Sequence, residues 1–149
     1  MKEVLRVITN NERETRGLGE FFAKEVLDFS SAKATVIGLE GDLGAGKTAF
    51  AKGFARGLGI QEEMKSPTFI LMRAFRVPRK NKMFLHFDAY RIAGAKEFLQ
   101  IGFKNLLKDS RNILFVEWAD KVASILPKNR VKIRISHLKK DRREFIFYG

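Results

Sequence analysis

A glycine-rich stretch at residues 41–48 carries the clearest chemistry in the sequence. It reads Gly41-Asp42-Leu43-Gly44-Ala45-Gly46-Lys47-Thr48 and matches the phosphate-binding pattern G-x-x-x-x-G-K-[ST] at every position. Glycines let the backbone wrap an anion, so that its amide groups point inward and the following helix adds its positive dipole end. We therefore expect Lys47 to reach the β- and γ-phosphates of a nucleotide and Thr48 to bind its Mg²⁺. A turn that binds nothing would not require Gly-Lys-Thr at the start of a helix.

The residues on either side of this loop predict a strand before it and a helix after it. Residues 35–39 form a short apolar run with β-branched members, long enough for one buried strand. Phe50, Phe54 and Leu58 follow at intervals of four, which is helical spacing, and this helix should end near residues 57–59, where glycines stand. Strand, glycine turn and helix are the arrangement that the motif requires.

The remaining pattern predicts a single α/β domain with a central, mostly parallel sheet, an antiparallel hairpin portion and flanking helices. The first helix should follow one of two capping-box patterns, beginning at Thr9 or Asn11, and should bury Leu18, Phe22, Val26 and Phe29, with Phe21 widening the apolar stripe. Further strands are expected at residues 3–9, 66–77, 83–88, 112–118, 130–135 and 144–148, and further helices at 95–107 and 119–126.

Two carboxylates end apolar runs and are candidates for the metal and the attacking water. Asp88 follows residues 84–87, and Glu117 follows residues 113–116. Because ligands of open α/β sheets bind at the carboxyl ends of the strands, either acid can reach a P-loop nucleotide. The alternative for each acid is a helix cap or a surface position. A guanine-reading Asn-Lys-x-Asp motif is absent from the sequence, which favours ATP over GTP.

Composition limits the partners and the compartment. The net charge of +12 favours a polyanion such as nucleic acid, and residues 65–87 carry six lysines and arginines without an acid, although cations also protect edge strands. His86 lies among aromatic and aliphatic residues and fits a core histidine, and Trp118 also fits the core. Without cysteine, a leader-like start or a long apolar run, the expected location is the cytoplasm.

Several motifs in fixed order resemble one known family. They are residues 41–48, Ser66-Pro67-Thr68-Phe69, His86-Phe87-Asp88-Ala89-Tyr90-Arg91 and Val116-Glu117-Trp118. In this order and at these intervals they closely resemble the TsaE (YjeE) family, the bacterial P-loop ATPases of tRNA threonylcarbamoyladenosine biosynthesis, over nearly the whole chain. The resemblance implies ATP and Mg²⁺ as ligands and the TsaD–TsaB complex as partner, and it implies a slow ATPase that the partners stimulate and that resets the complex between turnovers. We expect a monomer when the chain is isolated, and contact with tRNA either indirectly or through a basic face.

The resemblance also assigns roles to individual residues. It implies phosphate binding by Lys47, Mg²⁺ binding by Thr48 and Glu117, and a catalytic role for Asp88 near the γ-phosphate. It also implies a position beside the metal site for Trp118 and a switch role for residues 66–69. It extends the expected nucleotide contacts beyond residues 41–48 to Ala49, Glu12, Thr15 and Arg143. The sequence departs from the family pattern at Ala49, where a second threonine is usual, at Ala119, where proline is usual, and at Arg142, where glycine is usual. Two other functions remain open: a P-loop kinase of small molecules, and a binding module that uses the nucleotide without hydrolysing it.

Overall fold

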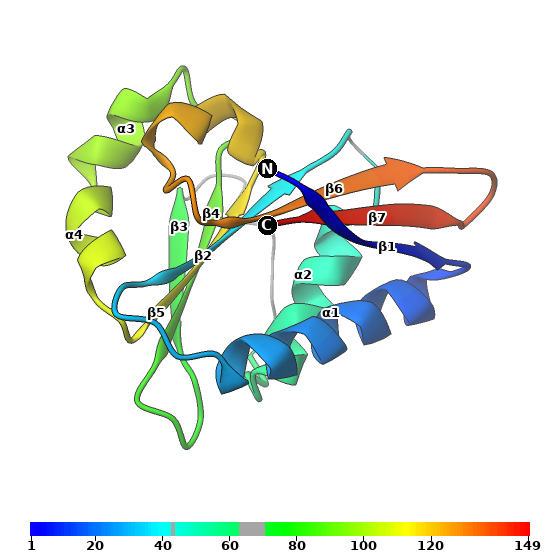
Figure 1. Cartoon of the computed structure of the whole chain (residues 1–149), viewed down its shortest axis with the longest axis horizontal. Helices are drawn as coiled ribbons and strands as arrows, with labels where there is room; N and C mark the ends of the chain where they lie inside the picture. Colours follow the sequence, from blue (N-terminus) through cyan, green and yellow to red (C-terminus); the bar gives the residue numbers. More distant parts are fainter. Residues whose placement is uncertain (43, 63–70) are drawn as a thin grey trace.

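The described part of the chain forms one seven-stranded sheet with helices on both faces (Figure 1). The computed structural model describes residues 1–42, 44–62 and 71–149. The strand order is β1-β7-β6-β2-β5-β4-β3. The predicted residues 66–70 of the hairpin's first strand lie outside the described residues.

The middle of the sheet is parallel, and three of its four strands end in an acidic residue. Its strands are β6 (Val131–His137), β2 (Thr35–Glu40), β5 (Asn112–Glu117) and β4 (Met83–Asp88). The three pairings among them are parallel, and β2 and β5 are buried almost throughout, as expected of strands covered on both faces. The register places Leu39 beside Glu117 and Asp88 beside Glu117, so both candidate acids reach the same edge of the sheet as the P-loop.

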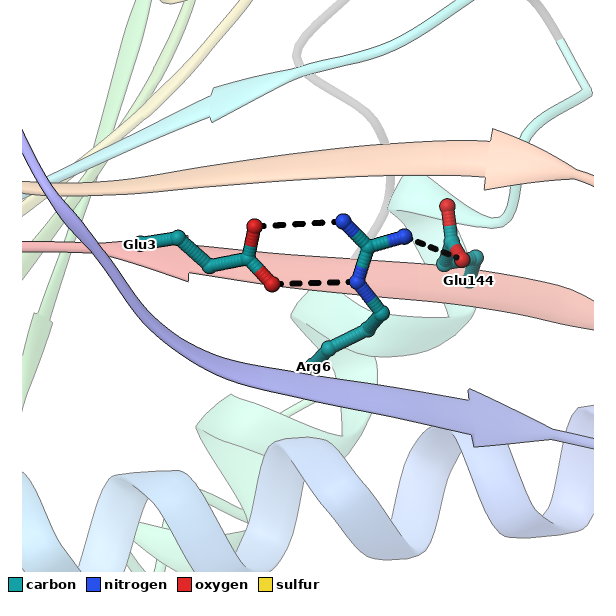
Figure 2. Close-up of polar contacts among 3 residues, drawn as sticks. All are labelled: Glu3, Arg6 and Glu144. Carbon is teal, nitrogen blue, oxygen red and sulfur yellow. Dashed lines mark hydrogen bonds and ion pairs between the residues drawn. The ribbon is translucent and has the colours of Figure 1, made fainter.

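Antiparallel strands complete both sides of this parallel centre. They are β3 (Met72–Arg76), which pairs with β4, β7 (Arg143–Tyr148), which pairs with β6, and β1 (Glu3–Thr9), which pairs with β7. Only β3 and β7 therefore run against the others, which confirms a mostly parallel sheet with hairpin portions. Figure 2 shows Arg6 of β1 between Glu3 at 3.0 Å and Glu144 of β7 at 3.1 Å, an exposed cluster that joins the two strands.

Two long helices cover one face of the sheet. They are α1 (Glu12–Asp28) and α2 (Lys47–Gly57), which pack against each other (Figure 1). Asn11 caps α1 by accepting from the amide of Glu14 at 2.8 Å, and the Glu14 carboxylate turns back to the amide of Asn10 at 2.9 Å. The prediction that Phe21 and Phe29 belong to the buried stripe is wrong, because their side chains are 62% and 60% exposed.

Shorter helices cover the other face. They are α3 (Ala95–Gln100), α4 (Phe103–Lys108) and the 3₁₀ helix η1 (Ala119–Ile125). The predicted single helix at 95–107 is therefore two helices, because Gly102 adopts a left-handed conformation with φ of 82° and interrupts the hydrogen-bonded ladder. Phe98 and Phe103 from these helices pack against Phe87 of β4 with ring centroids 5.2 and 5.4 Å away. Among the described helices, none combines the length and apolar character that crossing a bilayer requires.

Candidate nucleotide site

A cavity of about 460 Å³ lies where the carboxyl ends of β4 and β5 face the start of α2. Its wall comes from four parts of the chain that are far apart in sequence: the first turns of α1, the P-loop and α2, the strand ends, and the turn into β7. The lining residues are Glu12, Thr15, Gly44, Gly46, Lys47, Thr48, Ala49, Lys52, Asp88, Tyr90, Glu117, Trp118, Asp141 and Arg143.

The P-loop enters α2 through a glycine, which has no side chain to cap the first amide groups. Gly46 precedes the helix with φ of 101°, a conformation that residues with a Cβ rarely adopt. The first-turn amides of an α-helix have no partner inside the helix, and the helix dipole favours negative charge there. The geometry therefore suits a phosphate group at the start of α2.

Lys47 lies buried beside its own loop. Its Nζ donates to the carbonyl oxygen of Asp42 at 2.7 Å and to that of Gly41, and it sits 4.0 Å from the centre of the Trp118 ring. Burial lowers the pKa of this lysine, and the nearby carboxylates of Glu117 and Asp42 partly oppose the shift. The buried ammonium thus donates to two neutral carbonyl oxygens, which are weaker acceptors than the oxygens of an anion. Lys47 can therefore exchange them for a phosphate group.

Glu117 ends β5 as a buried acid. Glu117 is only 5% exposed, and its Oε2 lies 2.5 Å from Nε2 of His86, a residue that is 2% exposed. Glu117 is therefore neither a surface acid nor a helix cap, because η1 begins two residues later after Trp118 with no side-chain cap. His86 lies in the core, as its neighbours in the sequence suggested, and it also contacts the acid of the site.

Asp88 is the half-buried acid on the adjacent strand. Its Oδ1 accepts from the amide of Tyr90 at 2.9 Å, which holds the carboxylate in a turn at the end of β4. The parallel register sets Asp88 directly beside Glu117, and both line the cavity. The site therefore carries one deeply buried carboxylate and one more accessible carboxylate.

The far ends of the chain supply two further walls. Thr15 of α1 is buried, and its hydroxyl lies 2.7 Å from that of Thr9, while Glu12 lies one turn earlier on the same helix. Arg143 at the start of β7 lies against the P-loop, since a Cβ built on Gly46 would stand 3.3 Å from its Nε. That Nε is buried and has no hydrogen-bond partner among the described residues. A buried guanidinium nitrogen without an acceptor beside a phosphate loop fits an oxyanion.

The other predicted P-loop residues do not all face the cavity. Gly44, Thr48 and Ala49 line it, whereas Ala45 is buried and does not belong to the lining. Gly41 and Asp42 instead line a neighbouring hollow and reach the site through their carbonyl groups, which bind Lys47. Leu43 and the predicted switch at residues 66–69 lie outside the described residues.

Sequence reasoning missed three residues of the cavity wall. Lys52 stands four residues after Thr48 on α2, so helical spacing alone would have placed it on the same face. Tyr90 follows Asp88 by two residues, and its ring centroid lies 4.9 Å from that of Trp118, with the two planes tilted by 42°. Asp141 belongs to the turn before β7, and only the pairing of β7 with β6 brings it to the site.

The residues present fit a divalent cation held together with phosphates. Thr48 and Glu117 line one cavity, and Glu117 is a buried carboxylate whose contact is a histidine nitrogen. The described residues contain no group of three or more acidic or histidine side chains that could hold a metal by themselves. Mg²⁺ in nucleotide sites is usually held by one or two protein ligands, the substrate phosphates and water, which is the donor set available here.

The family comparison agrees with this geometry. A family model described as "Threonylcarbamoyl adenosine biosynthesis protein TsaE" matches residues 9–145. The chain belongs to the TsaE family. Family membership confirms the resemblance drawn from the motif order, and the match spans every wall of the cavity from Glu12 to Arg143.

Individual relatives are similar over most of their length. A protein named tRNA threonylcarbamoyladenosine biosynthesis protein TsaE from Bacillus subtilis is 34% identical over 142 residues, which cover 93% of this chain and 82% of the relative. The protein of the same name from Haemophilus influenzae is 35% identical, covering 80% of this chain and 73% of the relative. The crystal structure of Bacillus subtilis YdiB superposes with a TM-score of 0.74 and 30% identity, covering 99% of this chain and 86% of that chain.

Proposed function

We propose that this protein is the ATP-binding and ATP-hydrolysing subunit of tRNA threonylcarbamoyladenosine biosynthesis. In this proposal it acts with TsaD and TsaB, which modify the adenosine beside the anticodon in tRNAs that read codons beginning with A. It hydrolyses ATP slowly alone and faster with these partners, and the hydrolysis resets the complex between turnovers. The names of its relatives support the pathway, and the cavity supports the chemistry.

The observation that carries the proposal is the convergence of a phosphate loop and two carboxylates on one cavity. Lys47 and Thr48 come from the loop, and Asp88 and Glu117 come from the ends of two neighbouring parallel strands. A loop that only turned the chain would not need a buried carboxylate and a buried lysine in the same cavity, since burying such charges is costly without a compensating role.

Each residue has a distinct task in hydrolysis. Lys47 exchanges its loop carbonyls for phosphate oxygens, and the amides at the start of α2 bind the same phosphates. Thr48 and Glu117 hold Mg²⁺, which neutralises charge that develops on the transferred phosphoryl group. Asp88, the more accessible acid, orients the attacking water beside the γ-phosphate. Arg143 offers its buried Nε to a phosphate oxygen.

The deciding experiment measures ATP turnover with and without TsaD–TsaB. We expect slow hydrolysis by the protein alone and stimulation by the partners. Asp88→Asn and Glu117→Ala should each lose about 100-fold or more, because the first removes the group that orients the attacking water and the second removes a ligand of the metal ion. The Lys47→Ala variant should fail to support tRNA modification in cells that lack the native copy. Intact modification by that variant would refute the proposed role.

The same assay separates the two other functions. In a small-molecule kinase, Asp88 would orient an acceptor hydroxyl, and labelled γ-phosphate would reach a metabolite faster than water. In a binding module, Asp88→Asn would still bind ATP and would leave the cellular function unchanged. Either result would overturn the ATPase assignment while retaining the nucleotide site.

A direct contact with tRNA is a separate question. The cationic stretch of residues 71–87 lies on β3, on β4 and in the turn between them, and that turn is at the end of β4 opposite the cavity. If this face binds tRNA, the affinity should fall steeply with added salt, because each neutralised phosphate releases counterions. Filter-binding titrations at two salt concentrations test this point independently of ATP turnover.

A further inference from the structure

We propose that His86 is the positioning residue for the metal-binding carboxylate, because its Nε2–H holds Oε2 of Glu117 and leaves the second carboxylate oxygen to the cavity. The inference rests on the proposed nucleotide function, and it adds a residue on which the metal-binding oxygen depends. His86 itself is not among the residues that line the cavity.

The contact is short and crosses two strands. Nε2 of His86 on β4 lies 2.5 Å from Oε2 of Glu117 on β5, and both side chains are almost completely buried. In the parallel register His86 stands beside Phe115, and Asp88 stands beside Glu117, so the bond runs diagonally between the strands toward the site. A hydrogen bond that depends on this register forms only in the folded sheet.

Aromatic neighbours fix the orientation of the imidazole. The ring stacks on Phe84 with centroids 6.0 Å apart and planes at 11°, and it meets the edge of Phe115 at 5.6 Å and 76°. Packing on two sides leaves the ring little rotational freedom. The donor is therefore held in place before any ligand arrives, which is what a residue that orients a metal ligand must provide.

The surroundings also select the tautomer. Nδ1 of His86 is buried and has no hydrogen-bond partner among the described residues. A proton on Nδ1 would be a buried donor without an acceptor, whereas a bare lone pair there costs less. Because a carboxylate oxygen can only accept, the proton in this contact is on Nε2, and His86 donates it to Glu117.

The hydrogen bond from His86 occupies only one of the two carboxylate oxygens of Glu117. His86 contacts Oε2 of Glu117, and Glu117 lines the same cavity as Thr48.

The test compares three substitutions that differ in where a donor remains. Glutamine can place its amide nitrogen near the position of Nε2, asparagine is too short to do so, and leucine has no donor. Titration calorimetry of a non-hydrolysable ATP analogue, in EDTA and across Mg²⁺ concentrations, separates metal affinity from nucleotide affinity. We expect His86→Leu and His86→Asn to lose about 10- to 100-fold in Mg²⁺ affinity, and His86→Gln to stay within about threefold of the native protein.

Two further measurements separate positioning from a structural role. In EDTA, where no metal is bound, the three variants should bind the nucleotide within about twofold of the native protein, because Lys47 and the helix amides are unchanged. Phe84→Leu disturbs the same stack without removing the hydrogen bond, so it should lower the melting temperature while leaving Mg²⁺ affinity within about threefold.

The outcomes that overturn the inference are specific. They are unchanged Mg²⁺ affinity in His86→Leu, an equal loss in the glutamine and asparagine variants, or a loss in Phe84→Leu as large as that in His86→Leu. If the leucine variant does not fold, the glutamine and asparagine variants decide the question between them. A native protein that binds no nucleotide would instead refute the proposed function.

Discussion

Among the glycines where α1 and α2 meet, Gly53 leaves the least room for a side chain, and a single methyl group there should force the helices apart. A Cβ built on Gly53 would stand 2.0 Å from the carbonyl oxygen of Arg16, while real Cβ atoms essentially never approach another heavy atom within 3.0 Å. The obstacle is backbone, which cannot swing away as a side chain can. Gly53→Ala therefore requires the two helices to separate by at least about 1 Å.

The magnitude follows from two opposing effects. Alanine favours a helix over glycine by about 1 kcal/mol. Overpacking costs about 1–3 kcal/mol or more, and a gap near 1 Å forfeits up to half of each dispersion contact across the interface, where Phe22 meets Phe50 and Phe54. We expect a net loss of about 2 kcal/mol in the free energy of unfolding. For a chain of this size that corresponds to a melting temperature lower by about 6 °C.

Gly17 provides a matched control on the same helix pair. A Cβ at Gly17 would meet nothing within 4 Å, so Gly17→Ala gains helix propensity without a clash. It should raise the melting temperature by about 2–3 °C. Differential scanning calorimetry of both variants is the assay.

A functional measurement can accompany the melting curves. Because α1 carries Thr15 and α2 carries Lys47, separation of the helices also moves two walls of the cavity. Nucleotide affinity should fall in Gly53→Ala and stay unchanged in Gly17→Ala. A Gly53→Ala protein that melts at or above the native temperature would show that the close packing of these helices does not limit stability.

The remaining predictions concern charge. Because burial lowers the pKa of Lys47 below its usual 10.5, its ammonium destabilises the folded state at every pH where it stays protonated. The melting temperature of the native protein relative to Lys47→Met should therefore rise as the pH increases toward 10.5, and a constant difference would contradict this. Glu117→Gln should lower Mg²⁺-dependent nucleotide affinity about 10- to 100-fold while leaving binding in EDTA undiminished, and calorimetry showing equal losses in both buffers would argue against a metal role. Hydrogen bonds from Arg111 hold the pKa of Asp109 at about 2, so in Arg111→Gln the NMR titration midpoint of this carboxyl should move toward 3.8, and an unmoved midpoint would exclude that cause.

Local patterns were sufficient wherever the structure depends on neighbouring residues. The P-loop, its preceding strand and its following helix are contiguous, so composition and spacing located them, and the acids that end β4 and β5 followed from apolar runs. Local patterns were insufficient at Phe21 and at residues 95–107. Helical spacing does not reveal how much of a helix the sheet covers, so Phe21 could fit the apolar stripe and still face solvent. A glycine such as Gly102 within a helical pattern can either continue the helix or break it.

The amino-acid sequence by itself determined that a phosphate-binding loop joins a buried strand to a helix, because that chemistry resides in consecutive residues. Only the tertiary structure decided that β5 lies beside β2 and β4 beside β5, and therefore that Asp88 and Glu117 face one cavity. It also brought Thr15 and Arg143 to that cavity and set His86 against Glu117, 31 positions away. Such long-range neighbours depend on strand order and register, which backbone hydrogen bonds and core packing settle together.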